Sequence, residues 1–455
     1  MSEHNAAEMF AAHVAGTNFE NVPTAAIERA KVFILDSLGV GIAGSSVPHA
    51  QALLAIAAHW GAHEEAPAWG HAVRLPAAGA AFLNAWQMHN QEFDCLHEGA
   101  VVHAMASVLP AALAVAETRA PISGRELIVA VAVGCDVAAT LGLAARAGMR
   151  FFRPATAGGF GAVAAAGRPL GQNNAALQRA FAFQLAQASG TMQAHLEGSA
   201  ILPMQVGLNA RAALTACELA TLDLTPPRAV FEGPFGYLEL FESAWEIAPL
   251  LDELGQRWRI AEFSHKPYPA GRATHGGIEG VAALRIQAGF EPNEVQEVHI
   301  SAPPLIVRLV GRPDLAAPEP SYARLCMAYV VAKMLQHGTL DPTQFRGAAL
   351  ADPATHELAA RVRTESDGNP DPNALAPQSV TVRLADGRAL TWRCETMLAS
   401  PSRPLDHAAH LDKFRRCWQL AAEPLPPDNR EHLIGLVDGL ETIADLRQLT
   451  QHLAA

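Results

Sequence analysis

Apolar residues recur at spacings of three and four along most of the first 260 residues, and alanine fills many of these positions. Ile27, Ala30, Ile34 and Leu38 are one example. This spacing places apolar side chains on one face of an α-helix, and alanine has the highest intrinsic helix propensity. No alternating run of β-branched residues interrupts the segment, as a doubly wound sheet would require. Helices are expected near residues 47–58, 76–90, 104–118, 123–146, 160–169, 173–190 and 204–221.

The pattern changes near residue 263. Residues 294–301 and 379–395 alternate with period two, and Asp386-Gly387 in the second segment is typical of a hairpin turn. Helical spacing lies between them, near residues 321–336 and 353–361, and returns in the tail at 407–421 and 431–454. The sequence therefore predicts a mainly α fold, a large all-α helical domain with an inserted smaller α+β lid domain. The expected boundaries are 1–262 for the first part of the body, 263–398 for the lid, and 399–455 for helices that return to the body.

The composition excludes several kinds of partner. Half of the 455 residues are hydrophobic and only 17% are charged, which indicates a large buried core. The formal net charge of −12 repels phosphate backbones and anionic lipid, so neither nucleic acid nor a membrane is expected as a partner. The longest apolar stretch, residues 127–145, carries Asp136 at its centre and favours a buried helix over a membrane span.

The six cysteines are scattered without a C-x-x-C pair, which is typical of buried thiols in a reducing compartment. Neither histidine nor cysteine shows metal-ligand spacing, so no metal is expected. The first ten residues have neither a basic nor an apolar leader pattern. A cytoplasmic protein is expected.

The first chemical motif combines Asp94, His97, Glu98 and His103 just ahead of an apolar helix. Ionisable groups beside a core are costly unless they bind one another or a ligand. Histidine both takes and returns protons near neutral pH, so the motif indicates an acid–base cluster. The alternative is a surface loop whose acids cap the next helix.

A second motif, Arg153 followed by Gly158, Gly159 and Gly161, opens a helical stretch. Free backbone amides at a helix start suit a carboxylate, and arginine adds a forked donor. The alternative is close packing of two helices. A third motif gathers basic and aromatic residues at the predicted domain boundary: His265, Lys266, Tyr268, Arg272 and His275. In an acidic chain this local positive charge favours a small carboxylate, and the alternative is a hinge with exposed basic residues.

These motifs lie in segments that together resemble the MmgE/PrpD family, whose members include dehydratases, decarboxylases and an epimerase. The segments run through nearly the whole chain: AAIERAKVFILDSLGVGIAG (25–44), EFDCLHEGAVVHAMASVLPAALAVAE (92–117), TAGGFGAVAAAGRPLG (156–171), QASGTMQAHLEGS (187–199), VFEGPFGY (230–237), KPYPAGRATHGGIEG (266–280) and, more weakly, ARLCMAYVVA (323–332). The resemblance implies an all-α domain with an α+β lid, a homodimer and no cofactor.

The resemblance also implies a site between body and lid. The family's functional positions align onto Glu92, Asp94, His103, Lys266, His275 and Tyr329. Arg153 stands where the family often carries a histidine, and Leu202 and Gln205 stand where many members carry lysine and histidine.

These observations give a first hypothesis, a cofactor-free lyase that removes a proton α to a carboxylate of a small di- or tricarboxylic acid. His103 would be the base or acid, Asp94 would orient it, His275 would be its counterpart, and Lys266 would anchor the substrate. Further substrate contacts are expected from Arg153, Arg272, Tyr268, Tyr329, His97, Gly158 and Gly159. One alternative is an epimerase, which returns the proton to the other face. A second is an inactive binding homologue, motivated by Leu202 and Gln205.

Overall fold

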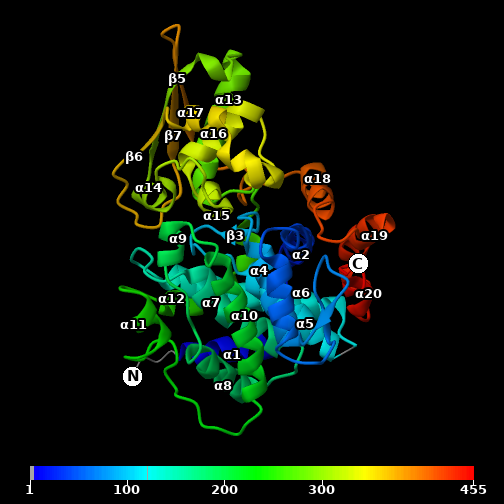
Figure 1. The fold of residues 1–455 in the computed structure, drawn as a ribbon. Coiled ribbons are helices and arrows are strands. Elements are labelled where there is room, and N and C mark those ends of the chain that lie inside the picture. Colours follow the sequence, from blue (N-terminus) through cyan, green and yellow to red (C-terminus); the bar gives the residue numbers. More distant parts are fainter. Residues whose placement is uncertain (1–4, 120, 455) are drawn as a thin grey trace.

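The computed structural model describes residues 5–119 and 121–454. Of the first ten residues, for which no leader pattern was expected, residues 1–4 lie outside the described residues. The fold is mainly α, as predicted (Figure 1). Helices of the lower part, called here the helical body, surround a central group of five that pack on one another. The five are α4 (Ala77–His89), α5 (Met105–Thr118), α6 (Gly124–Ala144), α7 (Arg153–Gly167) and α10 (Leu202–Leu219).

The remaining helices of the first half cover this group. They are α1 (Ala6–Gly16), α2 (Thr24–Gly44), α3 (Ala50–Ala58), α8 (Asn174–Leu185), α9 (Gln193–Glu197), α11 (Tyr237–Phe241) and α12 (Ala248–Leu251). Helix α7 begins seven residues before the predicted start at residue 160, because Pro154 is compatible with the first helical turn. Gly161 lets α7 approach α6 closely: a Cβ atom there would lie 2.5 Å from the carbonyl oxygen of Gly134.

Helix α6 is long and apolar enough to span a membrane by length and composition alone. It lies instead in the core, where 94% of its most apolar 18-residue window is buried. Its central Asp136 accepts hydrogen bonds from the backbone N–H of Arg259 at 2.7 Å and from Nε2 of His13 at 2.9 Å. The prediction of a buried helix is therefore confirmed, since this carboxylate has its partners inside the protein.

A four-stranded sheet of order β6-β5-β7-β8 forms the upper part, called here the sheet part. Strands β5 and β6 are parallel and the other pairs antiparallel. The two segments predicted as β thus pair in one sheet, and the predicted hairpin turns at Gly387, whose φ is +89°. The strand bounds are β5 (Val295–Ala302), β6 (Val362–Ser366), β7 (Gln378–Leu384) and β8 (Ala389–Cys394).

Two helices pack against this sheet, α13 (His275–Ala288) on β7 and β8 and α16 (Met327–His337) on β6. The helical stretch expected at 321–336 is broken at Leu325-Cys326, so α15 (Pro320–Arg324) precedes α16. Shorter helices α14 (Pro304–Val310) and α17 (Pro353–Ala359) complete the sheet part. Two-residue strands β3 (Leu96–His97) and β4 (Phe263–Ser264) pair at the base of this part.

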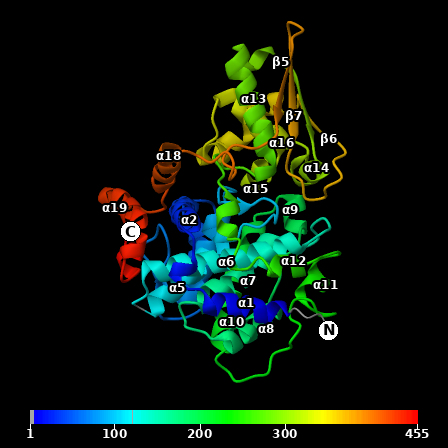
Figure 2. The same ribbon diagram turned by 180° about the vertical axis from the view of Figure 1, so that it is seen from behind.

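The chain then returns to the helical body, as Figure 2 shows from behind. Helix α18 (His407–Trp418) and helix α19 (Pro427–Asp438) pack on α2, and α20 (Arg447–Thr450) packs on α5. The helical pattern expected up to residue 454 is interrupted at Gly439, where α19 ends.

Candidate active site

A cavity of about 50 Å³ lies where the helical body meets the sheet part. The body contributes the end of α4, the loop that follows it, the start of α7 and helix α9. The other wall comes from residues 271–273, from α14 and from Leu375 in the loop before β7. The polar side chains on its walls are His89, Glu92, His103, His195 and Arg272.

Asp94 is the centre of the cluster beside this cavity. One of its oxygens, Oδ2, accepts hydrogen bonds from Nδ1 of both His103 and His89, each at 2.9 Å. The carboxylate is fully buried. Burial opposes its charge, but the two imidazoles hold the pKa of Asp94 well below its ordinary value. A charged Asp94 therefore fixes the orientation of both rings.

The loop that carries this cluster has a constrained backbone. Glu92 and Val101 both have φ of 52°, in the left-handed region that residues other than glycine rarely adopt. Between them, backbone hydrogen bonds join His97 and Val102 in both directions. Such conformations persist only where the surrounding structure enforces them, and they gather at functional sites.

His103 presents its second nitrogen to the cavity. Because Nδ1–H donates to Asp94, the neutral ring carries its lone pair on Nε2, which has no hydrogen-bond partner in the described part of the chain. Burial lowers the pKa of His103 below 6.5, although Asp94 acts in the opposite direction. The imidazole is thus neutral at neutral pH and is able to accept a proton from a ligand.

Lys266 binds to the same cluster but does not line the cavity. Its Nζ lies 2.7 Å from Oε2 of Glu92 and 4.0 Å from Oδ1 of Asp94, and the side chain is fully buried. Burial opposes ionisation of Glu92, but Lys266 and then His89 lower its pKa to about 2. Lys266 and His103 therefore belong to one buried cluster, but Lys266 does not face the cavity as a substrate anchor would. A hinge with exposed basic residues, the alternative, does not describe Lys266 either, since its side chain is fully buried.

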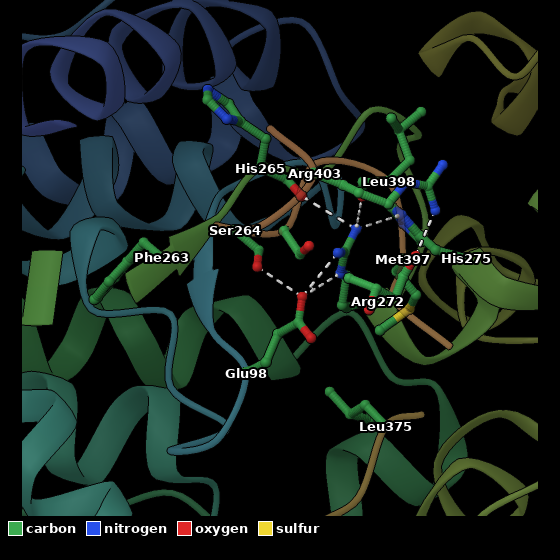
Figure 3. A network of polar contacts seen from close by, with 12 residues as sticks. Glu98, Phe263, Ser264, His265, Arg272, His275, Leu375, Met397, Leu398 and Arg403 are labelled. Atoms are coloured by element: carbon green, nitrogen blue, oxygen red, sulfur yellow. Dashed lines mark hydrogen bonds and ion pairs between the residues drawn. The ribbon is translucent and has the colours of Figure 1, made fainter. Parts of the chain in front are cut away.

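Arg272 lines the cavity, and among the described residues it is the only lysine or arginine that does so. Its guanidinium pairs with Glu98 at 2.7 Å and donates to the carbonyl oxygens of Leu398 and His265 (Figure 3). It also donates to Nδ1 of His275 at 3.3 Å. These partners hold the side chain in one position with only 3% of its surface exposed.

His275 lies behind Arg272 and does not line the cavity. Its Nε2 donates to the carbonyl oxygen of Ala270 at 3.1 Å, so both ring nitrogens are occupied. Burial and then Arg272 lower the pKa of His275 well below 6.5. The structure therefore gives His275 a role in positioning Arg272, in place of the expected acid–base counterpart.

Arg153 and the glycines of α7 do not form the expected anion site. Arg153 is fully buried and binds Glu242 through two hydrogen bonds of 2.8 and 3.0 Å, which satisfy its fork. Gly158 and Gly159 lie inside α7, beyond the first turn where amides are free. Cβ atoms there would lie 2.8 Å from Oγ of Ser107 and 2.3 Å from Nε2 of Gln184. Close helix packing, the alternative reading, explains these glycines.

Three further candidate residues make their contacts outside the cavity. His97 is on β3 with Nε2 2.8 Å from Glu262, and its Nδ1 accepts from the backbone of Ala100. The hydroxyl of Tyr329 donates to the carbonyl oxygen of Ala349 at 2.9 Å. Tyr268 stacks edge-on against His275, and burial and then Glu279 raise its pKa to about 12. None of the three lines the cavity.

Two histidines of the cavity were missed by sequence reasoning. His89 ends α4, five residues before Asp94, and that spacing was the available signal. His195 lies on α9, where burial and then Arg312 lower its pKa to about 4. It falls within a segment that carried the family resemblance, but nothing in its local sequence distinguishes it from a surface residue.

Residues far apart in sequence also form two groups of possible metal ligands, which spacing along the chain does not reveal. His89, Asp94 and His103 form one group, and Asp36, His265 and His410 form the other, each with donor atoms within 4.8 Å of one another. A buried ammonium lies beside each group. Nζ of Lys266 is 4.0 Å from Asp94, and Nζ of Lys413 is 2.7 Å from Asp36.

Stability should fall as the pH drops below about 6.5. His195 and His410 have pKa values near 4 because they are buried, against 6.5 when exposed. The unfolded chain binds these protons first, so each neutral histidine loses up to about 3 kcal/mol of its contribution between pH 6.5 and 4. The midpoint of thermal denaturation should fall between pH 6.5 and 4. This fall should be smaller in His410→Gln. A flat profile between pH 6.5 and 4.5 would contradict the assignment.

A mainly helical fold, with a carboxylate-held histidine and a fixed arginine at one cavity, is the arrangement expected of an acid–base enzyme. Residues 8–249 match the MmgE/PrpD N-terminal domain, and residues 268–438 match the MmgE/PrpD C-terminal domain. The chain belongs to the MmgE/PrpD family.

Similar proteins of known activity cover nearly the whole chain. Cis-aconitate decarboxylase of Mus musculus is 27% identical over 98% of this chain and 92% of its own length. The Homo sapiens protein of that name is 27% identical over 97% and 93%. Cis-aconitate decarboxylase of Aspergillus terreus is 25% identical over 95% and 92%. These relatives are enzymes, and they support a lyase-type function.

Proposed function

We propose that this protein is a cofactor-independent lyase that acts on a small di- or tricarboxylic acid, beginning with proton abstraction α to a carboxylate. The observation that carries the proposal is the pair of Asp94 and His103. A buried carboxylate fixes the tautomer of His103, and the free Nε2 belongs to a ring that lines the cavity.

The charge that develops on proton removal needs a cation already in place. Arg272 fits this role because it reaches the cavity and is held by Glu98 and two carbonyl oxygens. Binding the substrate carboxylate at Arg272 would place the neighbouring carbon near His103. The proton transfer would then occur between two groups that are already held in position. If water is lost, the electron pair left on that carbon forms a double bond as a β-hydroxyl departs with a proton. If carbon dioxide is lost, the bond to that carboxyl carbon breaks first and the electron pair left behind takes up a proton, so that protonated His103 would act there as the acid.

We propose that residues 263–398 act as a lid over this cavity. The cavity is lined from both the helical body and the sheet part, so separating them would open it. Closing would expel water from the reacting atoms. Residues 263–274 connect the helical body to the sheet part, and this segment includes Arg272.

An epimerase is the second candidate, because two histidines with lowered pKa values line the same cavity. His103 would remove the proton, and His195, which lines the same cavity from α9, would deliver one to the opposite face of the carbon. No leaving group is lost in this reaction.

Incubating the protein with cis-aconitate, citrate and aspartate-type acids in deuterated water separates these possibilities. A lyase should give a product lighter by carbon dioxide or water, whereas an epimerase should return the full skeleton with one deuterium. Saturable thermal stabilisation by these acids without turnover would favour a binding homologue and contradict both enzymes.

Activity is expected to survive prolonged chelation with EDTA. Asp94 already accepts from two imidazoles, and the ammonium of Lys266 lies 4.0 Å away, which disfavours a divalent cation at this carboxylate. The measurement is turnover before and after chelation and gel filtration. Full loss that one specific divalent ion restores would refute the expectation.

A further inference from the structure

A second cavity, of about 40 Å³, lies at the same junction but has different walls. Arg324 and Arg346 line it together with Trp86, Asn90 and Ser321. It is separated from the His103 cavity by a thin layer, because consecutive residues face different cavities. Asn90 and Arg324 belong to this one, while His89 and Leu325 belong to the other.

Arg324 is a buried cation without a counter-ion. Only 2% of its surface is exposed, and no carboxylate lies within ion-pair distance of it among the residues that the structure describes. In that same part of the chain its guanidinium makes no hydrogen bond. Its Cζ atom lies over the ring of Phe345, 4.9 Å from the ring centroid. A buried charge without a partner is costly, so it indicates a missing anion.

The other groups of this cavity add donors. Arg346 donates to Ser46 at 3.1 Å and Gln91 at 3.4 Å, both neutral, and its Nε has no partner in residues 5–119 and 121–454. The indole N–H of Trp86 is likewise buried and unpaired within the described ranges. The cavity's one acidic side chain, Glu319, is exposed at the rim and forms no ion pair with either arginine in the described structure.

Electrostatics agrees with this geometry. Burial and then Arg346 lower the pKa of Arg324 to about 9, while Glu92 acts in the opposite direction. Two positive charges that repel each other are held close together, and neither forms an ion pair with a carboxylate of residues 5–119 or 121–454. The interaction with Glu92 also shows that this cavity lies within electrostatic reach of the His103 cluster.

We propose that Arg324 and Arg346 form a second anion site, distinct from the His103 cavity, that binds the carboxylate or phosphate group of a small metabolite. A volume of about 40 Å³ holds roughly three waters, which is enough for one such group. The rest of the molecule would extend past the exposed rim at Glu319.

Thermal denaturation of the full chain tests the site, with inorganic phosphate and citrate as separate probes and sodium chloride of equal ionic strength as the reference. One or both anions should raise the midpoint saturably. Arg324→Gln and Arg346→Gln should each weaken the apparent affinity at least tenfold. Arg119→Gln, which removes an exposed arginine far from the cavity lining, should not. The anion that raises the denaturation midpoint shows whether the site prefers a phosphate or a carboxylate group.

The same titration in Arg272→Gln, which removes the cation of the His103 cavity, assigns the effect to one cavity. Stabilisation that persists in Arg272→Gln but is lost in the Arg324 and Arg346 variants supports the second site. Stabilisation that is lost in Arg272→Gln and kept in both the Arg324 and Arg346 variants would overturn it, as would the lack of any effect beyond sodium chloride. Should Arg324→Gln fail to fold, Arg346→Gln decides alone, because its guanidinium is only half-buried and its partners are neutral.

Discussion

Replacing His103 by alanine is expected to reduce turnover by about 100- to 10,000-fold while substrate binding is largely retained. Asp94 holds Nδ1 of this ring, its Nε2 is free, and burial lowers its pKa, whereas the pKa of His89, which Asp94 also holds, is raised. Removal of the His103 ring deletes the base but leaves Arg272 and its partners in place. Turnover of cis-aconitate and citrate gives the first quantity, and thermal stabilisation by the same acids gives the second.

The matched control is His299→Ala, which removes a histidine from β5 that pairs with Glu365 at the surface. It should be kinetically silent. Asp94→Asn gives a finer readout, because Asp94 raises the pKa of His103 against burial. The base works unprotonated, so the acid limb of kcat/KM should lie below pH 6.5 and should move to still lower pH in Asp94→Asn. His103→Ala with a tenth or more of normal turnover would exclude His103 as the base.

The parts of this site that sequence reasoning found are those that depend on local spacing. Asp94 and His103 are nine positions apart, in one loop that precedes an apolar helix, so their contact follows from the chain itself. The helices and the β7–β8 hairpin were equally accessible, because periodicity and an Asp-Gly turn are local signals. Helix ends shifted where a proline or glycine determined the boundary, as at Pro154 and Gly439.

The roles that sequence reasoning assigned incorrectly depend on partners brought in by the fold. Arg153 meets Glu242 across 89 positions, and Lys266 meets Glu92 across 174. A basic residue gives no local sign of whether a carboxylate will neutralise it. Arg153 and Arg324 are both buried, yet the first has its counter-ion and the second does not. Sequence reasoning named the first as a substrate contact and passed over the second.

Lys266→Met should be the most destabilising single change at the junction, by about 3–5 kcal/mol, because it leaves buried carboxylates without their cation. Glu92 loses a partner at 2.7 Å and Asp94 one at 4.0 Å, and both carboxylates are buried. The measurement is the free energy of unfolding from denaturant titration. A substrate anchor free to leave Glu92 would predict a change in KM with nearly unchanged stability.

A double-mutant cycle with Glu92→Gln separates the pair from its surroundings. If the ion pair is the dominant interaction, Lys266→Met combined with Glu92→Gln should recover much of the lost stability, because neither buried charge then remains unpaired. Activity should not return with it. The charge of Lys266 lowers the pKa of both His89 and His103, that of Glu92 raises the pKa of His89, and Lys266 lies 4.0 Å from Asp94. Recovery of stability without turnover would assign the pair to the electrostatics of the base, whereas recovery of both would reduce it to a structural contact between the helical body and the connecting segment.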